Sequence, residues 1–250
     1  MTKNKKSVTK KTTSAPKENC AISEDLLKFR KNLSQSFKNS PLPEEELMFN
    51  LGMYTRGSLL VKFLVISDLY KRILDIPGNI YEFGTWWGQN MILCENLRAI
   101  YEPFNKQRHI IGFDTFSGYN NSWYSTSKNY KKYLEELLET HEGNNILGHI
   151  RGQHTLIEGD VCKTVPKHFD SNKNEIVALA YLDIGTYDTT RAILTSIKPN
   201  LVKGSIILLD QFSWKEMPGE AMAFKEIFKN SEYKIEKCNL YPSKAIVTIL

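Results

Sequence analysis

Apolar residues recur along this chain with two different periods, and the change of period separates the expected helices from the expected strands. Helical spacing runs from Ser23 to about Asn39 and again from about Glu44 to Ile73, with a Pro-Leu-Pro break between the two stretches. After Pro77-Gly78, short apolar runs typical of strands alternate with helical stretches. Strands are predicted at 79–83, 109–114, 155–158, 176–183, 205–210, 233–238 and 245–250, and helices at 89–101, 129–141, 189–197 and 219–228.

This alternation predicts an α/β fold with a doubly wound, mostly parallel sheet, because parallel strands need helical crossovers. The run 176–183 is apolar almost throughout, which is typical of a strand covered on both faces. We therefore expect an α/β domain over 77–250, preceded by an N-terminal helical cover over 23–76. Residues 1–22 contain almost nothing apolar, and we expect a disordered basic tail there.

The position of the charge excludes one class of partner. The chain carries a net charge of +5, and residues 1–20 alone hold six lysines against one acid. The remainder is therefore formally neutral, which argues against a nucleic-acid groove. No apolar run is long enough to span a bilayer, and the four cysteines (Cys20, Cys94, Cys162 and Cys238) form no metal-ligand pattern, so we expect a reduced cytoplasmic protein.

Each predicted parallel strand ends at or beside an acidic residue. Ligands of doubly wound sheets bind beyond the carboxyl ends of the strands, so these acids are expected to share one site. Loop caps explain single acids, but five together point to function. The residues are Glu82, Asp114, Asp160, Asp183 and Asp210.

The first of these strand ends indicates which ligand to expect. The turn Gly84-Thr85-Trp86-Trp87-Gly88 lacks the middle glycine that a pyrophosphate needs for close backbone approach, and the chain has no P-loop motif. An adenosine with a bulky, unphosphorylated 5′ group fits better, and S-adenosylmethionine (SAM) is the obvious case. Glu82 would hold the ligand ammonium, Asp114 the ribose hydroxyls and Asp160 the adenine amino group.

Several blocks of the chain resemble the macrocin O-methyltransferase family, which are class I SAM-dependent methyltransferases acting on sugar hydroxyls of natural products or surface glycans. The resemblance covers roughly 50–250 and is carried by PGNIYEFGTWWGQN, RHIIGFDTFSGY, LIEGDVCKTVP, YLDIGTYDTTRAILTSIKPNLVKGSIILLDQF and PGEAMAF. It implies a Rossmann-like sheet of seven strands. It also implies cofactor-binding roles for Glu82, Phe83, Gly84, Asp114, Thr115, Phe116, Gly159, Asp160, Val161, Asp183 and Arg56.

The same resemblance implies that Asp183 and Asp210 are catalytic and hold a divalent cation such as Mg²⁺, with Gln211 beside them. Here the sequence departs from the family pattern. The motif Leu-Asp-x-Asp-x-Tyr carries Gly185 in place of its second acid, and the usual pair of acids after the fifth strand is Asp210-Gln211. An amide is a weaker ligand for a hard cation than a carboxylate, so metal binding should be weakened. The expected general base is also missing, and the candidates to replace it are His141, His149, His154, Glu220 and Asp188.

Three functions remain open at this point. The first is a metal-assisted O-methyltransferase with another base. The second is a metal-independent methyltransferase acting on an amine or an acidic hydroxyl, and the third is a SAM-fold scaffold without turnover. The segment Tyr119–Tyr130 is rich in aromatic, hydroxyl and amide groups and suits a small sugar-like acceptor above the site. We also expect a homodimer.

Overall fold

The computed structural model describes residues 24–117, 130–145 and 152–250, and it divides the chain into two compact units, Met1–Arg56 and Gly57–Leu250. The predicted tail and most of the segment 119–130 lie outside the described residues. Within its described part, the first unit consists of α1 (Glu24–Lys38), α2 (Glu44–Phe49) and the short 3-10 helix η1 (Leu51–Tyr54).

The second unit begins with α3 (Gly57–Arg72), which packs against α4 and contributes Ile66 and Leu69 to the core. The predicted cover 23–76 is thus divided, because α3 has an apolar face that the sheet unit buries. The observed boundary lies at residues 56 and 57 and not at 76 and 77.

The sheet of the second unit has seven strands in the order β3-β2-β1-β4-β5-β7-β6, and the antiparallel β7 is the exception in an otherwise parallel arrangement. This confirms the predicted fold class. The strands are β1 (Asn79–Phe83), β2 (Ile110–Asp114), β3 (His154–Glu158), β4 (Val177–Leu182), β5 (Leu201–Leu209), β6 (Tyr233–Lys237) and β7 (Ala245–Ile249). The order reverses between β1 and β4, which makes their carboxyl ends the expected ligand position.

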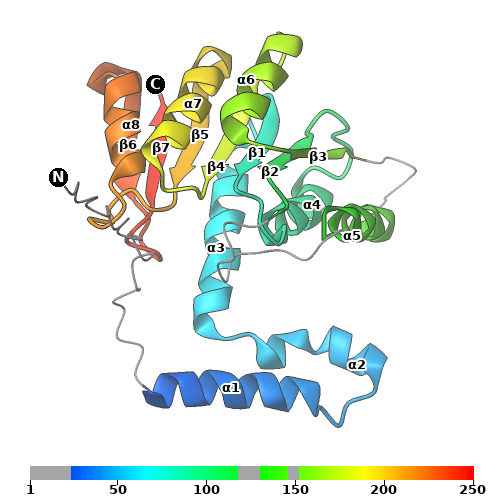
Figure 1. The fold of residues 1–250 in the computed structure, drawn as a ribbon. Helices are drawn as coiled ribbons and strands as arrows, with labels where there is room; N and C mark the ends of the chain where they lie inside the picture. Colours follow the sequence, from blue (N-terminus) through cyan, green and yellow to red (C-terminus); the bar gives the residue numbers. More distant parts are fainter. Residues whose placement is uncertain (1–23, 118–129, 146–151) are drawn as a thin grey trace, which may run out of the picture. The chain divides into compact units, whose positions relative to one another are not determined.

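Helices cover both faces of this sheet (Figure 1). One face carries α3, α4 and α5, and the other carries α6, α7 and α8. The bounds are α4 (Gln89–Tyr101), α5 (Tyr130–Asn145), α6 (Val161–Ser171), α7 (Tyr187–Ile197) and α8 (Gly219–Ile227), with the 3-10 turns η2 (Lys198–Asn200) and η3 (Asn230–Glu232). All residues of β1 and β4 are buried, and for β4 the apolar run 176–183 predicted this.

One helix was not predicted from the sequence. α6 follows β3 directly, and Pro166 in its interior obscures the helical pattern. Asp160 caps the helix, because its Oδ1 accepts a hydrogen bond from the amide of Cys162 (3.0 Å). The apolar pair Val165 and Phe169, one turn apart, is buried against the sheet.

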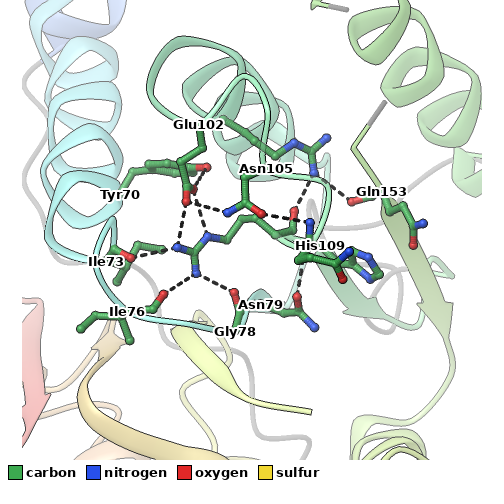
Figure 2. A network of polar contacts seen from close by, with 12 residues as sticks. Tyr70, Ile73, Ile76, Gly78, Asn79, Glu102, Asn105, His109 and Gln153 are labelled. Carbon is green, nitrogen blue, oxygen red and sulfur yellow. Dashed lines mark hydrogen bonds and ion pairs between the residues drawn. The ribbon is translucent and has the colours of Figure 1, made fainter. Parts of the chain in front are cut away.

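A buried arginine fastens the amino end of the sheet. The guanidinium of Arg108 donates to the carbonyls of Ile73 (2.9 Å) and Ile76 (2.9 Å) and to the carboxylate of Glu102 (3.0 Å). Tyr70 donates to the same carboxylate (2.7 Å), and Figure 2 shows Tyr70, Glu102, Ile73 and Ile76 gathered around this point. The network ties the loop after α3 to the loop before β2.

No helix in the described ranges is both long enough and apolar enough to cross a bilayer. The described cysteines, Cys94, Cys162 and Cys238, are free thiols.

Candidate functional site

The ends of the central strands are fastened to one another by backbone hydrogen bonds. The amide of Asp183 donates to the carbonyl of Phe83 (3.0 Å), and the amide of Asp210 donates to the carbonyl of Leu182 (3.0 Å). The carboxyl ends of β1, β4 and β5 therefore meet at one edge of the sheet. This brings Asp183 and Asp210 side by side, as the sequence predicted.

Gly84 turns the chain at the end of β1 and is required there by its neighbour. Its φ of +87° is in the left-handed region, and a Cβ atom at this position would lie 2.5 Å from the carbonyl oxygen of Asp183. No side chain fits, because the obstacle is backbone. The glycine thus allows β1 and β4 to approach each other at the switch point.

Asp114, at the end of β2, organises the loop beside this turn. Its Oδ2 accepts a hydrogen bond from the amide of Trp86 (2.7 Å), and its Oδ1 accepts one from the amide of Phe116 (2.9 Å). Both partners have positive φ angles, +49° and +50°, which non-glycine residues seldom adopt. Strained backbone of this kind concentrates at functional sites.

Glu82 is a buried carboxylate, and one of its oxygens accepts no hydrogen bond from the described residues. The residue is 4% exposed, and its Oε1 accepts a hydrogen bond from Nδ2 of Asn90 (2.6 Å), while Oε2 has no hydrogen-bond partner among the described residues. Burial raises the pKa of Glu82 to about 8, against the opposing effect of the Lys62 ammonium and the Asn90 hydrogen bond. An unpartnered buried carboxylate oxygen is costly, and a cationic ligand group would satisfy it.

Asp183 follows directly after β4, at the carboxyl end of that strand. Solvent reaches its side chain, yet enough protein surrounds the carboxylate that desolvation raises its pKa, while the cations Lys244 and Lys62 act in the opposite direction. Its Oδ1 accepts a hydrogen bond from Nε2 of Gln211 (3.3 Å). A carboxylate that solvent can reach and that holds its proton more readily than usual suits proton transfer.

Asp210 is held by two groups that the sequence analysis missed. Its Oδ1 accepts a hydrogen bond from the hydroxyl of Tyr181 (2.6 Å) and forms an ion pair with Nζ of Lys244. Burial lowers the pKa of Lys244 to about 8, although the charge of Asp183 opposes that shift. The pairing of β5 with β7 brings Lys244 to Asp210, and no pattern within either segment predicts this contact.

The side chain of Gln211 fills the space that an acid at position 185 would need. A Cβ atom at Gly185 would lie 1.9 Å from Oε1 of Gln211 and 2.5 Å from the terminal methyl group of Met217. Gly185 also has a φ of +72°. The two departures from the family pattern are thus one structural change, because the amide occupies the place of the missing side chain.

Glu220 is a structural carboxylate and does not face solvent. Its Oε2 accepts a hydrogen bond from the amide of Gln211 (2.8 Å), and its Oε1 accepts one from the amide of Gly185 (3.3 Å). The residue is fully buried, and burial raises its pKa to about 7. Glu220 therefore holds the loops after β4 and β5 together, whereas Asp188 is exposed in the first turn of α7.

The remaining predicted cofactor positions are of several kinds. Phe83 and Phe116 are buried in the core, so their contribution at the surface is their backbone. Thr115 and Asp160 are exposed beside the loops after β2 and β3. Gly159 (φ +137°) and Val161, the first residue of α6, flank Asp160. Arg56 is an exposed residue at the end of the first unit.

The described histidine candidates for the base lie at the other end of the sheet. His154 begins β3, and its Nδ1 is 2.8 Å from Oε1 of the buried Glu95. His141 precedes Glu142, whose carboxylate pairs with Arg98 near the amino ends of β2 and β3. His149 lies outside the described residues.

Glu95, Glu142 and His154 approach one another closely enough to suggest a metal site. However, both oxygens of Glu142 are engaged, because Arg98 pairs with Oε2 and the amide of Gly152 donates to Oε1. Glu95 in turn faces His154. Arg98 and the amide of Gly152 therefore engage Glu142, which leaves that carboxylate without a free oxygen for a metal.

Known proteins with this fold identify the family. The family model for macrocin O-methyltransferase (TylF) matches residues 66–237. CalS11, described as a calicheamicin methyltransferase, has a solved structure that is 33% identical, with 90% of this chain and 93% of that chain covered and a TM-score of 0.85. Its apo structure, described as that of a TDP-rhamnose 3′-O-methyltransferase in calicheamicin biosynthesis, is 34% identical, with a TM-score of 0.83 and coverage of 90% and 95%.

The O-methyltransferase NovP is similar in fold, with 17% identity, a TM-score of 0.56 and coverage of 76% of this chain and 79% of that chain. No curated protein matches the sequence. The family match spans more than half of the chain, and the CalS11 structures cover nearly all of it. The chain therefore belongs to the macrocin O-methyltransferase family.

Proposed function

We propose that the protein transfers the methyl group of SAM to a hydroxyl group of a small, sugar-like acceptor. Membership in the family supports the methyl transfer. The similarity to a TDP-rhamnose 3′-O-methyltransferase over almost the whole of both chains supports a sugar hydroxyl as the acceptor. The fold alone would not support this choice, since many functions share it.

The observation that carries the proposal is the pair of carboxylates beside the turn at Gly84. Glu82 offers a buried oxygen without a partner, which suits the ammonium of the methionine part of SAM. Each oxygen of Asp114 accepts one backbone amide, and Oδ1 also accepts the hydroxyl of Thr115 (3.5 Å). Oδ2 therefore keeps a second lone pair for a ribose hydroxyl. Two acids on neighbouring strands thus fit the two ends of one ligand.

Further residues are proposed to contact the remaining parts of SAM. Asp160 is exposed next to the end of β3, and its carboxylate would accept a hydrogen bond from the adenine amino group. Thr115 and the backbone of Phe116 would line the ribose. Arg56 is proposed for the methionine end on the strength of the family resemblance.

SAM supplies an electrophilic methyl group on a sulfonium. The acceptor oxygen would attack that carbon, a C–O bond would form as the C–S bond breaks, and the hydroxyl proton would pass to the carboxylate of Asp183. Asp183 suits this role, because solvent reaches it and its pKa is raised. Of the described groups that the sequence offered as replacements for the base, Glu220 is buried among backbone amides and His154 lies at the far end of the sheet.

A panel of nucleotide-linked deoxysugars, with product detected by mass, tests the reaction. We expect methylation of at least one panel member, and Asp183→Asn should lower kcat by about 10²–10⁴-fold while the affinity for S-adenosylhomocysteine (SAH) changes little. Asp75→Asn, at an exposed residue between α3 and β1, is the matched control and should leave kcat unchanged. Methylation of amines in place of hydroxyls would favour the second function considered above, and SAH binding without any turnover would favour a scaffold.

The acceptor is thus expected to be a small molecule and not a nucleic acid. A cytoplasmic protein, suggested by the free thiols, and a homodimer remain expectations that accompany the proposal.

A further inference from the structure

Lys244 occupies a position where the family resemblance led us to expect a divalent cation. It immediately precedes β7, and the antiparallel register pairs Leu209 of β5 with Ala245 of β7. The next pair along the two chains is therefore Asp210 opposite Lys244, and side chains that face each other in this way interact. The sheet itself thus places an ammonium group against the carboxylate of Asp210.

The ammonium of Lys244 contacts Asp210, Tyr181 and Tyr241. Its Nζ forms an ion pair with Oδ1 of Asp210 and lies 3.2 Å from the hydroxyl of Tyr181, which donates to the same Oδ1 (2.6 Å). The ring of Tyr241 lies 4.4 Å from Nζ, and the amide of Lys244 donates to the carbonyl of Tyr241 (3.0 Å). The charge of Asp183 also acts on the ammonium.

The pair of Lys244 and Asp210 is buried and is not a surface contact. The side chains of Lys244 and Asp210 are 8% and 14% exposed. A buried ammonium is tolerated only when it is paired and hydrogen-bonded, and both conditions are met here. The hairpin that carries it is fixed to the loop after β5, since the amide of Ser213 donates to the carbonyl of Ser243 (3.2 Å).

The residues expected to hold a metal do not fit a divalent cation. Asp210 is engaged by an ammonium, which would repel a second cation next to it. Gln211 donates to Asp183 through Nε2, and its Oε1 fills the space over Gly185. Mg²⁺ requires near-ideal octahedral oxygen geometry, and Asp183 alone does not supply the protein's share of it.

We propose that the ammonium of Lys244, paired with Asp210, takes the place of the divalent cation, so that this site functions without a metal. The inference rests on the proposed function and deepens it. Lys244 acts as a positioning residue: it fixes Asp210 and places a positive charge near Asp183 at neutral pH, where the acceptor hydroxyl would lose its proton. A fixed charge of this kind needs no reorganisation during the reaction.

Titration with Mn²⁺, followed by the electron paramagnetic resonance signal of the free ion, tests this without an acceptor. At neutral pH the wild-type protein should leave Mn²⁺ free up to millimolar concentration. Lys244→Met keeps the apolar length of the side chain and removes the charge, so it should create a site that binds at least about tenfold more tightly. Adding Asp183→Asn should abolish that site.

Lys62→Met is the matched control, because Lys62 also acts electrostatically on Asp183 but has no described contact with Asp210. It should not create a Mn²⁺ site. Stoichiometric Mn²⁺ binding by the wild type that is lost in both Asp183→Asn and Asp210→Asn would overturn the proposal, and this result does not depend on the folding of any Lys244 variant. A folded Lys244→Met variant that fails to gain Mn²⁺ affinity would also contradict it.

SAH binding, measured separately, distinguishes a failure of the role proposed for Lys244 from a failure of the proposed methyltransferase function. Wild-type protein that binds SAH and also binds Mn²⁺ at Asp183 refutes the role of Lys244 and leaves the methyltransferase proposal standing. If the wild-type protein binds neither SAH nor Mn²⁺, the proposed methyltransferase function itself is refuted.

Discussion

A single methyl group at position 185 should reveal how closely Gly185 and Gln211 depend on each other. Gly185→Ala forces a side chain into a φ of +72°, which costs roughly 1–2 kcal/mol. Its Cβ would lie 1.9 Å from Oε1 of Gln211, so the amide must swing away and give up its hydrogen bond to Asp183, at a cost of about 0.5–1.5 kcal/mol. The substitution should therefore reduce the free energy of unfolding by about 1.5–3.5 kcal/mol.

The cost of displacing the Gln211 amide is absent when residue 211 is already alanine. In a Gln211→Ala background, Gly185→Ala should cost the backbone strain of about 1–2 kcal/mol and the shift of the Met217 methyl group, and both of these are shared with the wild-type background. The double-mutant cycle should therefore show a coupling of about 0.5–1.5 kcal/mol, measured by urea denaturation. Equal costs of Gly185→Ala in both backgrounds would show that Gln211 does not occupy the space over Gly185.

Gly143→Ala is the control for this cycle. Gly143 lies in α5, and a Cβ atom there would meet nothing within 4 Å. Alanine is the better helix former, so this change should stabilise the protein by about 0.5–1 kcal/mol. A matched loss of stability at Gly143 would mean that the effect at Gly185 is not specific to the site.

Three other changes test separate parts of the structure. Arg108→Met leaves the carboxylate of Glu102 without its cation and should cost about 3–5 kcal/mol in thermal or urea unfolding; a loss under 1 kcal/mol would refute the role of this network. Glu220→Gln places an amide donor against a backbone donor and should cost about 1–3 kcal/mol without displacing SAH, and a neutral result would contradict the bridging role. The pKa of Glu82 is raised to about 8, so the folded state binds an extra proton between about pH 4.5 and 8, and stability should fall as pH rises through this range. Glu82→Gln should remove that part of the slope in ligand-free urea unfolding, and an unchanged slope would count against it.

The sequence predicted those parts of the site that follow from strand order. Acids at strand ends could be located from the apolar runs, and parallel pairing then forces their carboxyl ends to one edge of the sheet. Asp114, Asp183 and Asp210 were placed in this way. The resemblance gave Gly84 a cofactor-binding role, and the structure adds a separate reason for a glycine there, because a Cβ atom would meet the backbone of Asp183.

The parts that could not be predicted depend on pairing between distant segments. Lys244 faces Asp210 only through the register of β5 and β7, and no pattern within either segment specifies that register. Gln211 reaches Gly185 across the same edge. In α6, Pro166 broke the apparent helical period, although Asp160 supplied an N-cap that could have been recognised.

The central claim is that Glu82 and Asp114 form the two ends of a SAM site, and calorimetric titration with SAH tests it most directly. The wild type should bind SAH with a measurable heat and a raised melting temperature. Asp114→Asn should weaken binding by roughly 10–100-fold, since hydrogen bonds to a charged acceptor are worth about 1.5–3 kcal/mol, and Asp188→Asn should bind as the wild type does. Absence of heat and of any thermal shift with the folded wild-type protein would contradict the account.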